Sequence, residues 1–376
     1  MCLWSRQRNV VGGGFVAGDA GTIRGSGSCG DLVLSVVDDE SRSGMLDTTR
    51  WQVVKIDAAQ HQSGHIPIAI HSFLAEGSYG RVYRATWGGQ VVAVKVIKHD
   101  LELLPLVQRE ADVLMSMHHP NVVSAMMYVS WQQQQRGAAP YDGGVQDLAQ
   151  TWIVQEFCDG GSLWDFVHFH DGLRDGPTDC LNMRLVLDLL VDIARALQYM
   201  HANLIIHGDL KSRNVLLVQS GERLSAKVID FGLSRRVALG SYVHTRTMGT
   251  ISHMSPEMLR DGHKSFSGDV YAFGMIMYET LTGCAPFYGL SCSEVVEKVL
   301  AKETPEVPPG MPQLYVDTML RCWHDEPQER PTFAQLLQSL DGIQADSGTW
   351  QSVRYWRCSC QSHLLNWTEG SLADTW

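Results

Sequence analysis

The stretch "HGDLKSRNVLL" occupies residues 207–217, and "DFG" follows at residues 230–232. Asp209 is a carboxylate that could accept a proton from a substrate hydroxyl. Asn214 and Asp230 supply the oxygen ligands that Mg²⁺ prefers. Their order and spacing predict a site for phosphoryl transfer.

The lysine between these groups, Lys211, adds a positive charge that could face a transferring phosphate. Either segment alone could instead be a solvated polar loop between two strands. The two together, in this order, resemble the catalytic loop and the metal-binding loop of eukaryotic protein kinases. The resemblance implies that the chain uses ATP and Mg²⁺.

Composition is compatible with such an enzyme. The 376 residues are 44% hydrophobic and 19% charged, enough for two compact lobes with cores of their own. The formal charge of −11 argues against a nucleic-acid partner. The most apolar helical pattern, at 183–200, carries charged residues and is no membrane span. Nine cysteines indicate reduced thiols, and we expect a cytoplasmic or nuclear protein without an organellar transit peptide.

Composition and the pattern of apolar residues change along the chain. We expect residues 1–65 to form a flexible leader, in which residues 51–56 could add a strand to the following domain. Strand-like alternation begins at residue 68. The kinase resemblance covers 68–340, with a small lobe over 68–157 and a large lobe over 158–340. We expect an exposed, glutamine-rich insertion at 132–150 and a tail of unknown structure at 342–376, and we predict a helix near 181–201.

Two small-lobe motifs follow the family pattern. "AEGSYGRV" at 75–82 resembles the glycine-rich loop, in which small residues let backbone N–H groups approach phosphates, with Ala75 in place of the first glycine. Lys95 ends "VAVK" and in the family neutralises the α- and β-phosphates, paired with Glu110 on the next helix. Read from the residues alone, the loop is also compatible with a plain glycine hairpin, and Glu110 with a solvated helix residue.

The segment "IVQEFCDGGSL" at 153–163 resembles the hinge between lobes, where backbone groups near Glu156 and Cys158 bind adenine. Gln155 would guard the back of that pocket. Cys158 could equally be a packing residue. The predicted nucleotide-binding residues are Leu74, Ala75, Glu76, Gly77, Ser78, Tyr79, Gly80, Arg81, Val82, Ala93, Lys95, Glu156 and Cys158.

The main departure is Gly208, which replaces the arginine of the family's His-Arg-Asp motif. That arginine contacts a phosphate on the activation segment, so its loss concerns regulation rather than phosphate transfer. Hydroxyls at Ser241, Thr245 and Thr247 are candidate phosphorylation sites or simply solvated.

Three further matches are structural in the family. Glu257 and Arg330 match a buried ion pair of the large lobe, and Asp269 matches an aspartate that braces the catalytic loop. Gly249-Thr250 matches the stretch that supports the peptide substrate. A polar loop at 168–180 contains histidines and aspartates, but their spacing fits no metal-ligand pattern.

The resemblance therefore implies an α+β, bilobal protein kinase fold, with a small antiparallel-sheet lobe and a larger, mostly helical lobe. "HGDLKSRN" and "GTISHMSPEML" look most like the tyrosine-kinase-like group, whose members mostly phosphorylate serine and threonine. The alternatives are a nucleotide-binding pseudokinase scaffold, a dual-specificity or tyrosine kinase, and a small-molecule kinase. The predicted catalytic residues are Lys95, Glu110, Asp209, Lys211, Asn214 and Asp230, and the expected metal ligands are Asn214 and Asp230.

Overall fold

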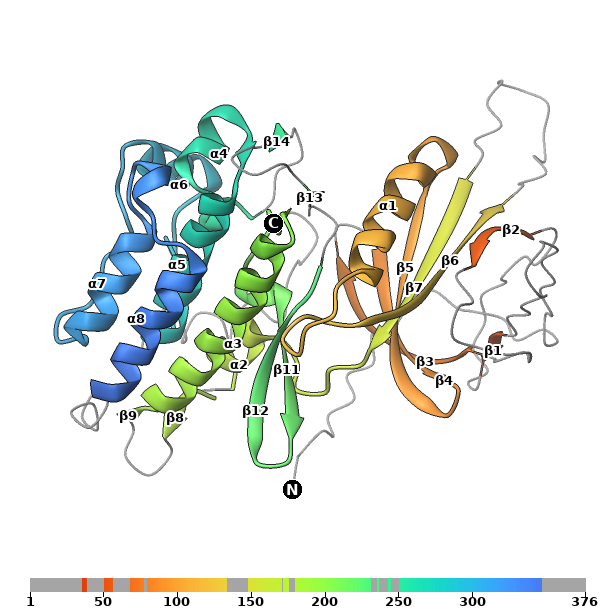
Figure 1. The fold of residues 1–376 in the computed structure, drawn as a ribbon, viewed down its shortest axis with the longest axis horizontal. Helices are drawn as coiled ribbons and strands as arrows, with labels where there is room; N and C mark the ends of the chain where they lie inside the picture. The colour runs from red at the N-terminus through yellow and green to blue at the C-terminus, as the bar shows by residue number, and fades with distance from the viewer. Residues whose placement is uncertain are drawn as a thin grey trace. The chain divides into compact units, whose positions relative to one another are not determined.

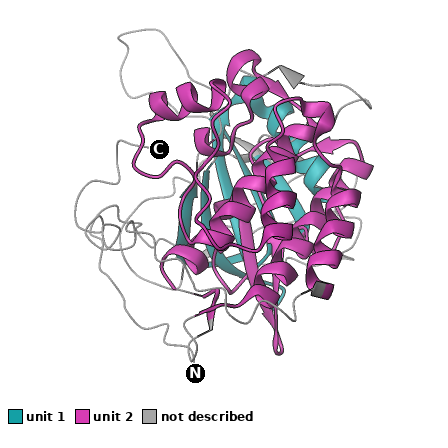
Figure 2. Cartoon of the chain, turned by 90° about the vertical axis from the view of Figure 1, so that its left-hand side faces the viewer, with its two compact units in different colours: residues 1–115, 125–157 teal, residues 116–124, 158–376 magenta. Residues whose placement is uncertain are grey.

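The computed structural model describes residues 36–38, 51–56, 68–77, 80–133, 148–170, 172–175, 180–230, 235–236, 243–244 and 250–346. The chain divides into two compact units, shown in different colours in Figure 2. The first unit contains residues 1–115 and 125–157, and the second contains 116–124 and 158–376. The division after residue 157 falls inside the predicted hinge segment.

A seven-stranded sheet with the order β1-β3-β4-β5-β7-β6-β2 dominates the first unit (Figure 1). Its central strands are all antiparallel, and they are β3 (Ile68–Gly77), β4 (Gly80–Trp87), β5 (Gln90–Asp100), β6 (Ala125–Gln133) and β7 (Leu148–Glu156). Val92, Val94 and Val96 alternate along β5 and pack with Trp152 and Val154 in one hydrophobic core. Alternation thus produces the sheet as the sequence predicted.

Within the described part of the first unit, one α-helix packs on this sheet. A single 3₁₀ turn, η1 (Leu101–Leu103), leads into α1 (Leu104–Met115), which contacts β6 and β7. Its buried residues Leu104, Val107, Ala111 and Leu114 recur every three or four positions, the spacing of one helical face. The helix that carries Glu110 therefore forms as expected and ends before His118.

Two outer strands extend the sheet from within the N-terminal 65 residues. β2 (Trp51–Ile56) pairs antiparallel with β6, so the additional strand predicted at 51–56 is present. β1 (Val36–Asp38) pairs parallel with β3 and was not predicted. Both strands lie in the segment for which we expected a flexible leader. Of the expected insertion, residues 134–147 lie outside the described residues.

The second unit is mostly helical. α3 (Met183–Ala202) matches the helix predicted near 181–201, and α5 (Phe266–Thr282) is buried along almost its whole length. The other helices are α2 (Leu163–His168), α4 (Pro256–Asp261), α6 (Cys292–Leu300), α7 (Gln313–Cys322) and α8 (Phe333–Asp346). Three 3₁₀ turns also occur here, η2 (Ser212–Asn214), η3 (Ile251–His253) and η4 (Pro327–Glu329).

Short strand pairs connect the helices of this unit. They are β8 (Arg174–Asp175) with β9 (Cys180–Leu181), β10 (Ile205–Ile206) with β13 (Arg235–Arg236), β11 (Val215–Ser220) with β12 (Arg223–Val228), and β14 (Val243–His244) with β15 (His263–Lys264). The predicted α+β class, with an antiparallel-sheet unit and a mostly helical unit, is confirmed.

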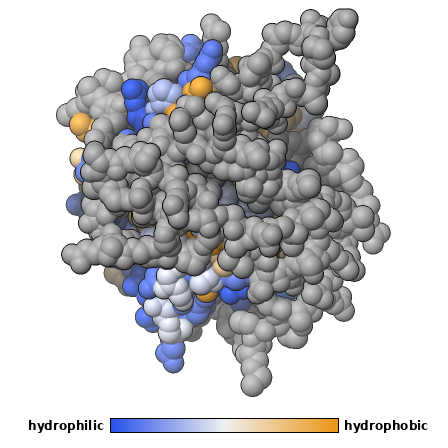
Figure 3. All heavy atoms as spheres, turned by 90° about the vertical axis from the view of Figure 1, so that its right-hand side faces the viewer, coloured by the Kyte–Doolittle hydropathy of each residue, from blue (hydrophilic) through white to orange (hydrophobic). Residues whose placement is uncertain are grey.

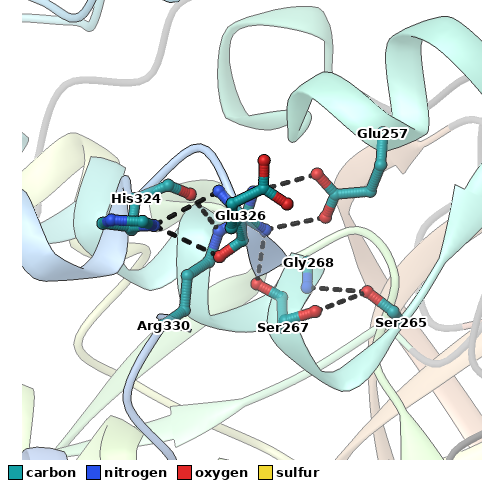
Figure 4. Close-up of polar contacts among 7 residues, drawn as sticks. All are labelled: Glu257, Ser265, Ser267, Gly268, His324, Glu326 and Arg330. Atoms are coloured by element: carbon teal, nitrogen blue, oxygen red, sulfur yellow. Dashed lines mark hydrogen bonds and ion pairs between the residues drawn. The ribbon is translucent and has the colours of Figure 1, made fainter. Parts of the chain in front are cut away.

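A buried ion pair connects α4 to the segment before α8 (Figure 4). Arg330 donates from Nη1 and Nη2 to the two Glu257 carboxylate oxygens, at 2.7 and 2.9 Å. It also donates to the carbonyl oxygens of Ser267 and His324. This bidentate arrangement satisfies most of the guanidinium, so the ion pair predicted from the sequence is confirmed.

The described side chains on the face shown in Figure 3 are largely hydrophilic, with hydrophobic residues scattered among them. Among the described residues, no helix combines the length and apolarity that crossing a membrane requires.

Candidate active site

Asp269, near the start of α5, anchors the catalytic loop. Its carboxylate accepts the backbone N–H groups of His207 and Gly208, at 2.9 and 2.8 Å, and lies 2.9 Å from His201 Nε2. Burial alone would raise the pKa of Asp269, but the contacts with His201, His207 and Gly208 outweigh it and lower that pKa. The carboxylate therefore stays ionised and braces the loop, as predicted.

His207 connects this loop to the end of β12. Its Nδ1 lies 3.2 Å from the backbone N–H of Asp209 and accepts from it, which leaves Nε2 to donate to the Ile229 carbonyl at 3.0 Å. The buried ring thereby fixes both Asp209 and the residue preceding Asp230.

The Asp209 carboxylate is the centre of a compact polar cluster. Oδ2 lies 3.1 Å from both Lys211 Nζ and Asn214 Nδ2. Oδ1 accepts the backbone N–H of Thr250 at 3.3 Å, and Lys211 Nζ also donates to Thr250 Oγ1 at 2.7 Å. The structure therefore brings together Asp209, Lys211 and Asn214 with the predicted substrate-support residue. A carboxylate held in this way can orient a hydroxyl and accept its proton.

Asn214 is oriented in a way that suits a cation. Its Nδ2 donates to both the backbone oxygen and Oδ2 of Asp209. The amide nitrogen is therefore engaged in hydrogen bonds, and Oδ1 is the atom that can bind a cation. The backbone N–H of Ile229 donates to the Asn214 carbonyl, which places the residue before Asp230 beside it.

Asp230 adopts a left-handed backbone conformation, with φ of 65°. Asparagine and aspartate tolerate this region better than most residues. An amide oxygen and one carboxylate fit Mg²⁺, which proteins hold with few side chains plus the phosphates of the substrate. The residues Phe231 and Gly232 that complete the motif lie outside the described residues.

The predicted glycine-rich loop forms the hairpin between β3 and β4. Ala75 pairs with Val82, Glu76 with Arg81, and Gly77 with Gly80, whereas Ser78 and Tyr79 lie outside the described residues. At Gly80 an added Cβ would clash with the carbonyl oxygen of Val96, so the close approach of β4 to β5 requires glycine there.

Glu76 and Arg81 form an exposed ion pair across this hairpin, with 2.9 Å between Arg81 Nε and Glu76 Oε1. Hydrogen bonding to Glu76 raises the pKa of Arg81. Leu74 is exposed on β3. These residues belong to the predicted phosphate-binding loop, and their role remains a prediction.

The other small-lobe residues lie on neighbouring strands of the same sheet. Lys95 on β5 is opposite Val82 on β4 and Ile153 on β7, and Ala93 is opposite Gln155. Glu110 lies on α1. This register groups the predicted phosphate-binding lysine with the hairpin.

The hinge residues follow directly. Glu156 ends β7 and pairs with Val92, Gln155 is buried, and Cys158 is buried at the start of the second unit. Adenine binding here stays a prediction.

A cavity of about 40 Å³ opens beside Asp209, large enough for a few water molecules. Residues 208–210 of the catalytic loop, the segment 250–255 and residues 263–265 all contribute to its lining. The acceptor carboxylate thus borders an open space rather than solid packing.

Sequence reasoning missed His201 as the third partner of Asp269. Its position at the end of α3, shortly before the catalytic loop, is the only signal that the sequence contains. Ser241, Thr245 and Thr247 lie outside the described residues.

A family model of protein tyrosine and serine/threonine kinases matches residues 68–340. The chain belongs to this kinase family. The predicted membership of the protein kinase superfamily is therefore confirmed. Members of this family generally use ATP and Mg²⁺, and a kinase domain implies a protein substrate.

Individual kinases resemble the chain over about three quarters of its length. A probable serine/threonine-protein kinase of Dictyostelium discoideum is 32% identical over 73% of the chain. Serine/threonine-protein kinase STY17 of Arabidopsis thaliana is 29% identical over 75%, and human mitogen-activated protein kinase kinase kinase 11 is 30% identical over 74%. The matched regions make up 28%, 45% and 31% of these three proteins, so the chain spans less than half of each.

Proposed function

We propose that this chain is an ATP-dependent protein kinase that transfers the γ-phosphoryl group to serine or threonine hydroxyls of protein substrates. The observation that supports it best is the cluster of Asp209, Lys211, Asn214 and Thr250, joined by contacts of 2.7–3.3 Å. The names of the serine/threonine kinases that the chain resembles support the same acceptor class. We place the protein in the cytoplasm or nucleus.

Each residue of the cluster has a distinct task. Asp209 orients the acceptor hydroxyl and accepts its proton. Lys211, which already bridges Asp209 and Thr250, balances the charge that develops on the transferred group. Asn214 and Asp230 would hold Mg²⁺, which neutralises phosphate charge when it is bound.

The first unit would supply the nucleotide contacts. The β3–β4 hairpin would present backbone N–H groups to the phosphates, and Lys95, with Glu110, would neutralise them. Backbone groups near Glu156 and Cys158 would bind adenine. Catalysis in this scheme depends on positioning and charge neutralisation rather than on a covalent enzyme intermediate.

The test compares the native chain with Asp209→Asn on a generic protein substrate, with Mg²⁺ and ATP. Because the amide cannot accept the proton, we expect turnover to fall at least about a hundredfold. Asp317→Asn, an exposed aspartate on α7, is the matched control and should retain native turnover.

Equal and negligible turnover in the native chain and Asp209→Asn would overturn the proposal in favour of a nucleotide-binding scaffold. Phosphoamino-acid analysis of the product separates the acceptor classes. Phosphotyrosine as the main product would contradict the serine/threonine assignment.

A further inference from the structure

Three buried titratable side chains meet in the second unit, and none of them is a predicted catalytic residue. Glu279 lies on α5 and is completely buried, with its carboxylate 3.6 Å from His253 Nε2 on η3 and 3.9 Å from His168 Nε2 on α2. His253 and His168 are themselves 7% and 5% exposed. One carboxylate is therefore shared between two imidazoles from different elements.

These contacts are electrostatic. Both distances exceed those of a good hydrogen bond, and within the described residues neither carboxylate oxygen has a hydrogen-bond partner. Desolvation raises the pKa of Glu279, yet the two imidazoles, His253 foremost, outweigh it and bring that pKa to about 2. An ionised carboxylate this deeply buried requires a nearby cation, and the imidazoles are the groups in ion-pair contact with it.

The other elements around Glu279 add one fixed charge. Arg213 on η2 lies 4.4 Å from the centre of the Trp164 ring, which in turn packs against His168 at a tilt of 37° between the ring planes. Burial lowers the pKa of Arg213, and Asp165 and Glu279 partly oppose this. The facing side of α7 contributes the hydroxyl of Tyr315, bonded to Thr280 and the Met277 carbonyl.

Two further charged side chains that adjoin α5 are paired with other groups. On α3, His201 contacts Asp269, and after η4, Arg330 contacts Glu257. The charge on Glu279 therefore depends on His253 and His168, with Arg213 acting at longer range.

His253 lies within one turn of the catalytic cluster. Its backbone N–H donates to the Thr250 carbonyl at 3.0 Å, and η3 begins immediately after Thr250. Thr250 in turn holds Asp209 through its N–H and Lys211 through its hydroxyl. A displacement of His253 is thus transmitted to Asp209 through a single short segment.

We infer that Glu279 is a positioning residue, which holds the Thr250 segment against Asp209 through His253 and makes phosphoryl transfer to protein substrates sensitive to pH. This inference rests on the proposed kinase activity. The ion-pair contact of Glu279 exists only while an imidazole carries a charge, and histidine is the side-chain type whose charge changes at pH values of about 5 to 8. When this contact is lost, the Thr250 segment loosens. Activity toward the protein substrate therefore falls on the alkaline side.

The experiment measures kcat and KM for protein substrate and for ATP between pH 6 and 9, in the native chain, Glu279→Gln and the control Glu297→Gln. Glu297 is an exposed glutamate on α6. Glutamine keeps the shape of Glu279 but needs no cation. We expect kcat/KM for protein substrate to fall about fivefold or more across this range in the native chain and the control, and by less than about twofold in Glu279→Gln. KM for ATP should remain the same in all three.

His253→Gln provides a second route if Glu279→Gln does not fold, because it removes the nearer imidazole and should also flatten the profile. Identical pH profiles in the native chain and in the folded variants would overturn the inference while leaving the kinase proposal intact. Absence of phosphoryl transfer by the native chain at every pH would overturn both.

Discussion

Gly208 differs from other residues of the catalytic loop in its side chain and in its backbone conformation. It has no side chain with which to bind a phosphate, and its backbone is left-handed, with φ of 75°. A residue with a Cβ pays a steric cost in this conformation. The glycine therefore lets the catalytic loop adopt this conformation next to Asp209 without steric strain, while its N–H donates to Asp269.

Replacing Gly208 with alanine should reduce the free energy of unfolding by about 1–2 kcal/mol, because alanine is strained at this φ. Urea denaturation measures the change. Gly342→Ala is the control, since Gly342 lies exposed inside α8 with nothing within 4 Å of an added Cβ. It should stabilise the protein by about 0.5–1 kcal/mol. An equal effect at both positions would contradict the assignment of backbone strain to Gly208.

At this scale, the sequence predicted the residues that carry the chemistry better than the residues that hold them in place. Asp209, Lys211 and Asn214 lie within six residues, so their grouping follows from local spacing. Glu279 and its two imidazoles are separated by long stretches of chain and meet only through the packing of α2, η3 and α5. No periodicity in the sequence encodes that meeting.

At the scale of elements, the Glu257–Arg330 pair connects α4, the start of α5 and the segment after η4. Its side chains are nearly inaccessible to solvent, so both charges have lost their hydration in the folded protein and depend on each other for compensation. Removing one partner would leave the other charge buried without compensation.

We expect Arg330→Met to lower the free energy of unfolding by about 3–5 kcal/mol in urea denaturation. The matched control is Arg260→Met, which removes an ion pair with Asp261 whose side chains are 63% and 38% exposed. That change should stay within about 1 kcal/mol of native. Comparable losses in the two variants would show that burial does not determine the value of the pair.

Long elements were predicted from the sequence more successfully than short ones. The apolar periodicity around 183–200 locates α3 almost to its ends, because twenty residues carry a repeated signal. The three residues of β1 carry none, and only their pairing with β3 defines them as a strand.

At the scale of the whole molecule, the two units contribute separate halves of the proposed machinery. The first contains the hairpin, Lys95 and Glu110, and the second contains Asp209, Asn214 and Asp230. The hairpin, Lys95 and Glu110 precede residue 115 and the other three residues follow residue 158, so the two sets are also separate along the chain.

Alanine at Ser241, Thr245 and Thr247 together should leave most basal activity in place. Gly208 has no side chain to bind a phosphate on this segment, so phosphorylation there should contribute little to positioning Asp209. The measurement is phosphoryl transfer by the triple variant and by the native chain after phosphatase treatment. A loss of more than about tenfold in the triple variant alone would refute the prediction.

The N-terminal strands have a consequence for solubility. Without β1 and β2, the sheet of the first unit would end in β3 and β6, strands of ten and nine residues with one row of backbone groups unpaired. Long open edges are templates on which a second chain can add a strand and begin aggregation. β1 and β2 pair with part of these two edges, over three and six residues, and so reduce the length of backbone that is open to strand addition. A proteolytic cut that removed β1 and β2 would leave both edges of the kinase-domain sheet exposed to strand addition.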